Sequence, residues 1–179
     1  MDVDAEDRRR RFEALAPAMV DPLRRFLLRR TDPDTADEVL ADTLLVCWRK
    51  VEQLPDEPLP WAYAVARHCL HNAQRGERRR RRLAAKVAGL AQPGDVPGPE
   101  PDGDPAVEAA LAALRPADAE LVRLWAWEQL TPAEIATVLD ITPNAASIRL
   151  YRARQKLAER LRKNDAGAGH EGSREGRRP

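Results

Sequence analysis

LTPAEIATVLDITPNAASIRLYRARQKL, residues 130–157, carries the start and stop signals of two helices in succession. Its opening TPAE, at 131–134, places a capping threonine, a proline at the first helical position and a glutamate that can reach back to the cap. Thr142, followed again by proline, repeats the start signal after the short turn LDIT. A short helix, a tight turn and a longer helix indicate a helix-turn-helix motif.

The second helix of this motif has one apolar face and one basic face. Five apolar residues recur at helical spacing and are expected to pack against the first helix: Ala146, Leu150, Ala153, Leu157 and Leu161. In a DNA-binding helix-turn-helix, the start of this helix meets base edges in the major groove. The candidates for base contacts are Asn144, Ala145, Ser147 and Arg149, and those for contacts nearer the phosphates are Arg152, Arg154 and Lys156. The alternative interpretation is an ordinary helical hairpin with a basic surface.

Helical periodicity also dominates the rest of the chain, which lacks the alternating patterns and Asn-Gly turns that mark strands. We predict helices near 5–29, 33–53 and 59–87 in the first half, and two more helices just before the helix-turn-helix. Trp125 and Trp127 are expected to pack in the core of the second half. The predicted fold class is therefore all-α.

Proline and glycine divide these helices into two domains. Residues 89–105, GLAQPGDVPGPEPDGDP, cannot bury enough apolar surface to fold and are predicted to form a flexible linker. The linker separates an N-terminal helical domain, 1–88, from a C-terminal four-helix domain, 106–163. The last segment, 164–179, is expected to be a disordered tail.

Charge is nearly balanced over the 179 residues, with 30 Lys and Arg against 29 Asp and Glu, but it is unevenly distributed. Residues 32–57 hold eight acidic and two basic side chains, whereas residues 60–90 hold eight basic and one acidic. Residues 142–163 hold seven basic and one acidic side chain. An acidic block therefore alternates with two basic blocks, and this distribution indicates more about partners than the net charge does.

The third predicted helix, 59–87, also has two faces. Its apolar face is expected to comprise Trp61, Val65 and Cys69 with Ala62, Ala66, Leu70 and Ala73. The opposite face suits nucleic acid, because arginine pairs with phosphates, asparagine can read an adenine edge and an aromatic ring can stack on an unpaired base. The candidates on that face are Tyr63, Arg67, Asn72, Arg75 and Arg79.

The second predicted helix, 33–53, is acidic outside and apolar inside. Its core positions are expected to be Leu40, Leu44, Cys47, Trp48 and Val51. Another face mixes acidic residues with a leucine and comprises Glu38, Asp42, Leu45 and Arg49. Two interpretations stay open for it: a solvated surface held by local charge pairs, or a surface that docks onto another protein.

Several classes of protein are not supported by the sequence. Cys47 and Cys69 are too few for a zinc site or a disulfide framework, so we expect buried hydrophobic positions in a reducing compartment. We find no metal-ligand cluster, phosphate-binding loop or nucleophile motif, and we expect neither a cofactor nor catalysis by this chain. The charged start and the absence of a long apolar run favour a soluble, cytoplasmic protein that does not insert into the membrane.

Taken together, these motifs resemble those of bacterial RNA polymerase sigma factors of the extracytoplasmic-function group of the sigma-70 family. ADEVLADTLLVCW, at 36–48, is similar to the family's acidic helix that binds the clamp helices of core polymerase. LPWAYAVARHCLHNAQRGERRRR, at 59–81, resembles its promoter-melting helix. The segment 130–157, and above all its RLYRARQKL, is similar to the domain that reads the upstream promoter element. The resemblance covers the chain outside the tails and the linker.

The resemblance implies a sigma factor that binds core RNA polymerase and directs promoter recognition, strand opening and transcription initiation. The polymerase would be contacted at the clamp of its largest subunit, and also at the flap, through a surface that includes Asp37, Glu38, Asp42, Leu45 and Arg49. The candidates on the third helix would engage the −10 element, where an unstacked base enters a pocket beside that helix and residues 52–60. The helix-turn-helix would engage the −35 element, and an anti-sigma protein is implied as a further partner.

Four positions depart from the family's pattern. Asp140 stands where a turn glycine is usual, Asn144 and Ala145 replace a Gly-Thr pair, and His68 stands where asparagine is frequent. Because aspartate tolerates a left-handed backbone better than most residues, we expect the turn to be kept. Two other functions stay open: a stand-alone helix-turn-helix regulator of transcription, and a helical adaptor that binds acidic proteins rather than DNA.

Overall fold

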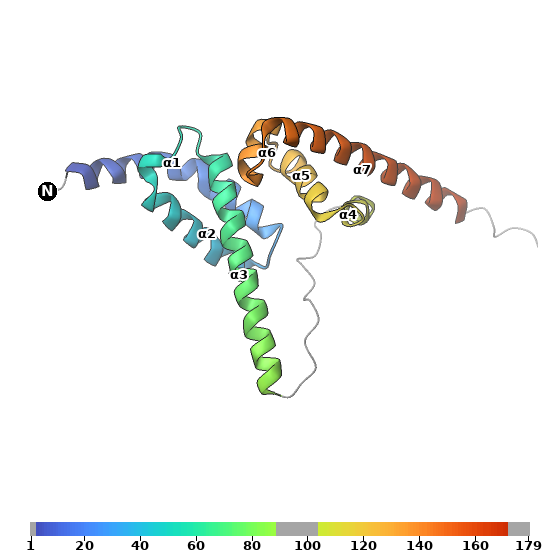
Figure 1. Cartoon of the computed structure of the whole chain (residues 1–179), viewed down its shortest axis with the longest axis horizontal. Coiled ribbons are helices and arrows are strands. Elements are labelled where there is room, and N and C mark those ends of the chain that lie inside the picture. Colours follow the sequence, from blue (N-terminus) through green and yellow to red (C-terminus); the bar gives the residue numbers. More distant parts are fainter. Residues whose placement is uncertain (1–2, 89–103, 172–179) are drawn as a thin grey trace, which may run out of the picture. The chain divides into compact units, whose positions relative to one another are not determined.

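The computed structural model describes residues 3–88 and 104–171, and its regular structure is entirely helical (Figure 1). The all-α class predicted from the sequence is therefore confirmed for these ranges. The chain divides into two compact units, residues 1–100 and 101–179. Residues 89–103, which make up most of the predicted linker, lie outside the described ranges.

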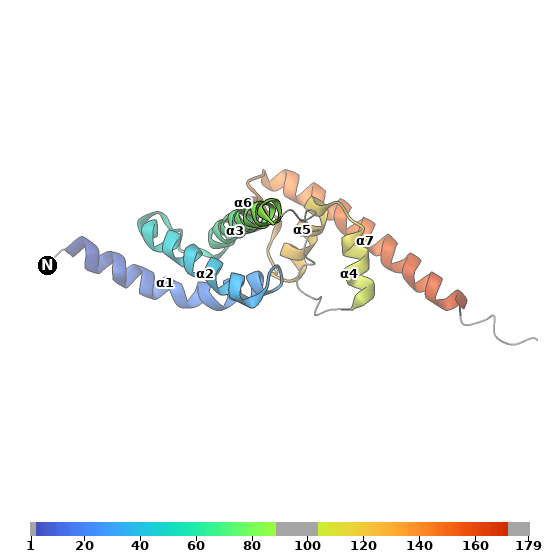
Figure 2. The same ribbon diagram turned by 90° about the horizontal axis from the view of Figure 1, so that it is seen from below.

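Over residues 3–88, the N-terminal unit is built from three long helices and one short turn of helix. These are α1 (Val3–Leu28), α2 (Pro33–Arg49), η1 (Val51–Gln53) and α3 (Leu59–Val87). Each long helix packs against both of the others, as the view along α3 shows (Figure 2). The core between them is apolar and includes Met19, Leu23, Phe26, Leu27, Val39, Cys47, Ala62 and Ala66.

The second helix begins as the sequence predicts but ends earlier. Asp32 caps it, since the Asp32 carboxylate accepts a hydrogen bond of 3.0 Å from the backbone N–H of Thr35. The helix stops at Arg49 rather than at residue 53, because Lys50 leaves helical geometry and η1 follows as a separate 3₁₀ turn. The predicted helix 33–53 is thus two elements, and the break lies just before the connection to α3.

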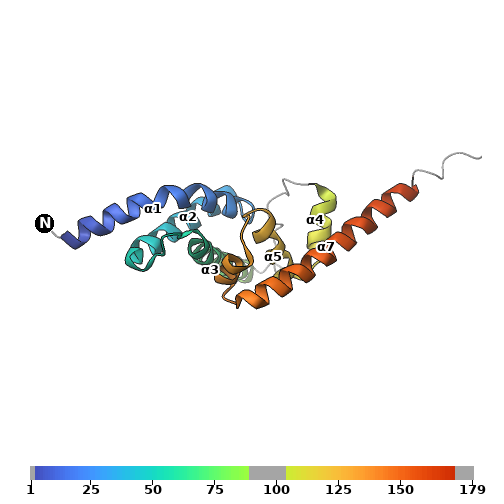
Figure 3. The same cartoon turned by 90° about the horizontal axis from the view of Figure 1, so that it is seen from above.

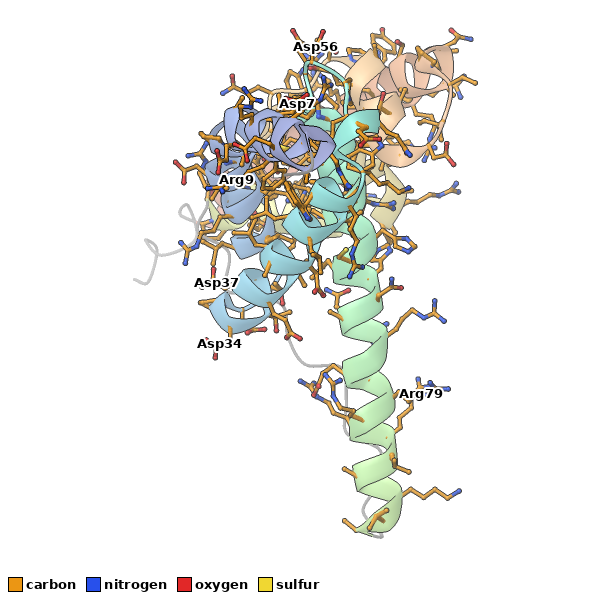
Figure 4. All side chains as sticks on the ribbon, turned by 90° about the vertical axis from the view of Figure 1, so that its left-hand side faces the viewer. Asp7, Arg9, Asp34, Asp37, Asp56 and Arg79 are labelled. Carbon is orange, nitrogen blue, oxygen red and sulfur yellow. The ribbon has the colours of Figure 1, made fainter. Side chains whose placement is uncertain are left out.

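The third helix is longer than the bundle that supports it. Its first half packs against α1 and α2, whereas its second half extends beyond them into open space (Figures 1 and 4). Leu83 and Val87 on that second half are both exposed. The arginine run that begins at Arg78 therefore lies on an extension of the helix with little tertiary packing.

Within residues 104–171, the C-terminal unit contains four helices that pack on one another (Figure 3). They are α4 (Pro105–Ala112), α5 (Pro116–Ala126), α6 (Pro132–Leu139) and α7 (Pro143–Glu171). Leu111, Leu114, Ala119, Val122 and Ala153 form a buried cluster, against which Val107, Trp127 and Leu157 pack. The four-helix domain predicted from the sequence is found.

Two sequence expectations for this unit are corrected. The segment 164–171, predicted as part of a disordered tail, continues α7, because adding residues to a formed helix costs far less than starting one; residues 172–179 lie outside the described ranges. Trp127 packs on the core as expected, but Trp125 is 37% exposed. The Arg154 guanidinium lies 4.0 Å from the centre of the Trp125 ring, so the ring supports a surface arginine.

Candidate nucleic-acid and protein interfaces

Helices α6 and α7 form the helix-turn-helix, and local hydrogen bonds fix both helix starts. The Thr131 hydroxyl accepts from the Glu134 N–H at 3.3 Å, and the Glu134 carboxylate accepts from the Thr131 N–H at 2.7 Å. The Thr142 hydroxyl accepts from the Ala145 N–H at 3.2 Å. Both caps predicted from the sequence are thus present, and together they fix the start of α7 relative to α6.

The turn between the two helices depends on an aspartate in a left-handed conformation. Asp140 has φ 53° and ψ 51°, and its backbone N–H bonds to the Ala136 carbonyl. The N–H of Ile141 reaches the same carbonyl at 3.0 Å. The turn expected from the sequence is therefore formed without a glycine. A left-handed backbone is less favourable for aspartate than for glycine, because aspartate has a Cβ atom.

Burial along α7 defines which of its side chains face outward. Ala146, Leu150 and Ala153 are buried against the other helices of the unit, in agreement with the predicted apolar face. At 100° per residue the opposite face carries exposed side chains, namely Asn144, Ile148, Tyr151, Arg152 and Gln155. This outward face is the part of the helix that a DNA groove can reach.

Two residues on the outward face of α7 were missed by sequence reasoning. Ile148 is 45% exposed and Tyr151 is 63% exposed, although both residue types usually indicate a core. The Tyr151 hydroxyl accepts a hydrogen bond of 2.8 Å from the Gln155 side chain, which orients the ring along the helix. The helical period could have identified both residues, because neither lies three or four residues from a member of the series that forms the buried face of α7.

The remaining candidates on α7 are arranged on its flanks. Ser147 is exposed and donates to the Pro143 carbonyl at 3.0 Å, while Ala145 and Arg149 are half-buried. Arg152 is exposed, but Arg154 lies over Trp125 as described above. Lys156 was expected near phosphates and instead pairs with Asp118 of α5 at 3.0 Å. The structure thus leaves Asn144 and Arg152 as the predicted polar contacts that point most directly outward.

In α3 the structure corrects one of the five predicted DNA contacts. Tyr63 is only 2% exposed, and its ring lies 5.0 Å from that of Phe26 in α1. It therefore belongs to the core of the N-terminal unit and offers no ring surface on which a base could stack. The aromatic ring near the start of the polar face is Trp61, which is half-buried and had been assigned to the core.

The other four candidates on α3 lie toward solvent. Asn72, Arg75 and Arg79 are exposed, and Arg67 is half-buried. Arg79 points away from the bundle on the extended half of the helix (Figure 4). Trp61, Asn72, Arg75 and Arg79 share the face opposite the buried residues Ala62, Ala66 and Leu70, so that they form one stripe along the helix.

An acidic residue, Glu77, directly precedes the arginine run of α3. The Glu77 carboxylate accepts hydrogen bonds from Arg80, at 2.9 and 3.1 Å, and from Arg81, at 2.7 Å. These side chains hold the pKa of Glu77 below its ordinary value, since they stabilise its charged form. The side chains of Arg80 and Arg81 are therefore directed along the helix toward Glu77, whereas Arg79 makes no hydrogen bond to Glu77.

Helix α2 presents its acidic residues to solvent. Ala36, Val39, Leu40, Thr43 and Cys47 face the core, and the opposite side carries Glu38, Asp42 and Arg49 around Leu45. Leu45 is 44% exposed, so an apolar side chain lies in the middle of an acidic surface. Such a patch fits a basic partner that also offers apolar contact.

Asp37 differs from the other acidic candidates because it already has a partner. Its two carboxylate oxygens accept from the Arg24 guanidinium of α1 at 2.9 and 3.5 Å. Both side chains are about half exposed, so the ion pair contributes little to stability. Both oxygens of the Asp37 carboxylate nevertheless already accept hydrogen bonds from Arg24. Figure 4 shows Asp34 and Asp37 near the first turn of α2. The surface formed by Glu38, Asp42, Leu45 and Arg49 is accordingly the better-exposed candidate, and we call it the acidic patch.

Other kinds of site find little support among the described residues. No group of three or more His, Cys, Asp and Glu side chains there could hold a metal ion. Burial raises the pKa of the Cys47 thiol to about 11, which keeps it protonated and unreactive. Within the same ranges, no helix has the length and apolar character needed to cross a bilayer.

Comparisons with known proteins bear on the same regions. The family model for region 4 of sigma-70 matches residues 105–157, which include α4, α5, α6 and the first half of α7. The chain is 26% identical to the RNA polymerase sigma factor NccH of Alcaligenes xylosoxydans xylosoxydans, over 80% of this chain and 81% of the relative. It is 28% identical to the RNA polymerase sigma factor CnrH of Cupriavidus metallidurans, with the same coverage of both chains.

Two solved structures have a similar fold. One is the sigma factor RpoE in complex with the anti-sigma factor NepR from Bartonella quintana, with a TM-score of 0.57 and 20% identity over 84% of this chain and 95% of that one. The other is CnrH in complex with the cytosolic domain of CnrY, with a TM-score of 0.50 and 23% identity over 84% of each chain. At these identities the likeness establishes the arrangement of helices.

Proposed function

We propose that the chain is a sigma factor of the sigma-70 family and acts as an extracytoplasmic-function member that directs core RNA polymerase to promoters. The single observation that carries the proposal is the set of exposed helix faces. One unit presents a basic helix beside an acidic patch, and the other presents a capped helix-turn-helix. A polymerase subunit that reads DNA needs all three surfaces.

The helix-turn-helix would read the −35 element as duplex DNA. In this mode the outward face of α7 enters the major groove, where Asn144 can bond a base edge and Ile148 can contact a thymine methyl group. Arg152 lies farther along the same face and would pair with a phosphate, which gives affinity that falls with salt. Ala145, Ser147 and Arg149 on the flanks stay candidate contacts at the edges of that groove.

The stripe on α3 would act on the −10 element. Arg75 and Arg79 can neutralise phosphates and Asn72 can bond an exposed base edge, while Trp61 offers the aromatic surface that Tyr63 does not. Arg67 lies on the flank of the same stripe. Unpairing a base costs a few kcal/mol, which stacking and hydrogen bonds in a pocket beside α3 and residues 52–60 would offset.

The acidic patch on α2 would attach the chain to the clamp of the polymerase, and the C-terminal unit would lie against the flap. Acidic side chains around an exposed leucine suit a basic, partly apolar partner surface. The polymerase would catalyse the nucleotidyl transfer, so this chain supplies promoter recognition and strand opening rather than a catalytic group.

We place the protein in the cytoplasm, because bacterial RNA polymerase and the promoter DNA are there.

An anti-sigma protein is a further proposed partner. RpoE and CnrH, whose folds are similar, were each solved bound to another chain, and NepR is described as an anti-sigma factor. An inhibitor that covers the acidic patch or the outward face of α7 would block polymerase or promoter binding directly. Both surfaces carry exposed apolar side chains, Leu45 on one and Ile148 with Tyr151 on the other, which an inhibitor could bury.

The proposal is tested by mixing the full chain with core RNA polymerase and measuring both complex formation and promoter-dependent transcription. We expect a stable complex and transcripts that begin at defined sites. Asp42→Arg should weaken the complex roughly 100-fold or more, because it places like charges together in the interface. Asp21→Arg is the matched control, since Asp21 is an exposed acid on α1, outside the acidic patch.

The same experiment separates the proposed function from its competitors. A stand-alone regulator would bind a duplex operator without polymerase, and the Asp42→Arg change would leave that binding intact. An adaptor for acidic proteins would form no sequence-specific complex with DNA in either setting. Failure to bind core polymerase at micromolar concentration would exclude the sigma factor function.

A further inference from the structure

The connection between α2 and α3 is held in place by the first turns of α1. The Arg11 guanidinium donates to the Val51 carbonyl from Nε at 3.1 Å and to the Leu54 carbonyl from Nη2 at 2.7 Å. These two carbonyls lie at the start and just beyond the end of η1, 40 and 43 residues away from Arg11 in the sequence. One side chain thus bridges a distant helix to the segment that leads into α3.

Neighbouring residues of α1 strengthen the same junction. The Arg8 guanidinium pairs with the Glu52 carboxylate at 3.4 Å and lies 5.8 Å from the centre of the Trp48 ring. Phe12 packs edge-to-face on Trp48 with ring centres 5.5 Å apart. The last turn of α2 and the start of η1 are therefore fastened to α1 by three of its residues, Arg8, Arg11 and Phe12, and the Arg11 bridge reaches farthest toward α3.

We propose that Arg11 is a positioning residue for strand capture, in that it fixes the loop of residues 54–58 in the geometry needed to receive an unpaired base. This inference rests on the proposed function, which places the captured base beside this loop and α3. The loop contributes Leu54 and Pro58 to the core but exposes Asp56 and Glu57, and Figure 4 shows Asp56 at its outer tip. The Leu54 carbonyl is the last anchored group before that tip.

The chemistry explains why arginine occupies this position. A carbonyl at the end of a short helix lacks an intrahelical partner, and a charged donor satisfies it with a bond stronger than a neutral one. The planar guanidinium can donate from two nitrogens at fixed separation, so it bridges two carbonyls at once. A lysine ammonium is a single point charge and cannot hold both in the same way. Displacing a capture loop by about 1 Å can cost on the order of 100-fold in a positioned reaction.

The test uses the holoenzyme formed from core polymerase and the full chain. A promoter is first selected from a random duplex library by the wild-type holoenzyme. The probes are then the single non-template strand of its −10 region and the duplex of its −35 region. Arg11→Met, which keeps the aliphatic stem and removes both donors, should weaken single-strand binding roughly 10-fold to 100-fold. Binding of the duplex probe and of core polymerase should stay within about twofold of the wild type.

Two further variants make the result specific to the bridge. The single-strand affinity of Arg11→Lys should lie closer to that of Arg11→Met than to that of the wild type. Lysine keeps the positive charge but lacks the two guanidinium nitrogens that bond both carbonyls. Arg9→Met is the matched control, since Arg9 pairs with Glu13 on the same helix and should change neither probe. Amide hydrogen exchange should accelerate at residues 50–58 in Arg11→Met and stay unchanged in α7.

The outcomes separate this inference from the function on which it rests. If the wild-type chain forms no holoenzyme, the proposed function fails. If the wild type is active and Arg11→Met binds the single strand as the wild type does, the positioning role alone is excluded. An equal loss of core, duplex and single-strand binding in Arg11→Met would also overturn it, because that pattern indicates general destabilisation.

Discussion

Helices α3 and α7 are both 29 residues long and strongly basic, yet they place their aromatic residues differently. In α7, Tyr151 stands on the outward face beside Ile148, so that apolar and polar groups reach solvent together. In α3, Tyr63 is buried against Phe26 and the outward stripe carries arginine and asparagine, with Trp61 half-buried at its start. A basic helix face indicates a polyanionic partner, and exposed apolar groups beside it add contacts that depend on the base they meet.

The largest expected contrast is between the two tyrosines. Tyr63→Ala removes a fully packed ring and should lower the free energy of unfolding of the N-terminal unit by about 3–5 kcal/mol. Tyr151→Ala should change stability by less than about 0.5 kcal/mol, because its ring is mostly exposed. Urea denaturation of each variant measures both values. A stable Tyr63→Ala protein with weakened promoter opening would instead return Tyr63 to the DNA-contacting face.

The second expected effect concerns specificity in α7. Ile148→Ala should reduce affinity for the −35 duplex by about 1–3 kcal/mol, with the loss confined to one base position. The reason is that an apolar side chain discriminates by contact with a base rather than by charge. Binding to a set of single-base variants of the selected promoter would measure it. A uniform loss across all variants, with a reduced salt slope, would assign Ile148 no base contact.

The smallest expected effect comes from Glu77, the acidic residue that directly precedes the arginine run of α3. Glu77→Gln removes the charge that holds Arg80 and Arg81 along the helix, so that more positive charge reaches the DNA backbone. Affinity for promoter DNA should rise, and the slope of log affinity against log salt should steepen by up to about 1. Glu13→Gln on α1 is a control with the same chemistry. An unchanged slope would indicate that the extended half of α3 does not contact DNA.

The sequence predicted the helix-turn-helix well because its signals are local. The caps at Thr131 and Thr142 and the left-handed Asp140 each act within a few residues, and the structure contains all three. The buried stripe of α7 was also predicted, since large and small apolar residues recur at one period. Within the helix-turn-helix, the signals that act between neighbouring residues thus predicted the caps and the turn correctly.

Several errors arise where the decisive partner is distant in sequence. The core face of α3 is lined by Ala62 and Ala66, whose small side chains give a weak periodic signal beside Trp61. The core face predicted for α3 is therefore displaced by about one residue from the observed core face. This displacement placed Tyr63 on the solvent-facing side in the prediction. Trp125 was assigned to the core because its partner, Arg154, lies on another helix. The Arg11 bridge spans more than 40 residues on one of its two bonds and leaves no local pattern at all.

The most direct measurement compares two variants of the holoenzyme on two DNA probes. One variant carries Arg75→Ala and Arg79→Ala in α3, and the other carries Arg152→Ala in α7. Fluorescence anisotropy gives the affinity for the single-stranded −10 probe and for the duplex −35 probe. We predict that the α3 variant weakens single-strand binding and spares the duplex, whereas the α7 variant does the reverse. If each variant weakens both probes equally, or if neither does, the division of labour between the two helices is contradicted.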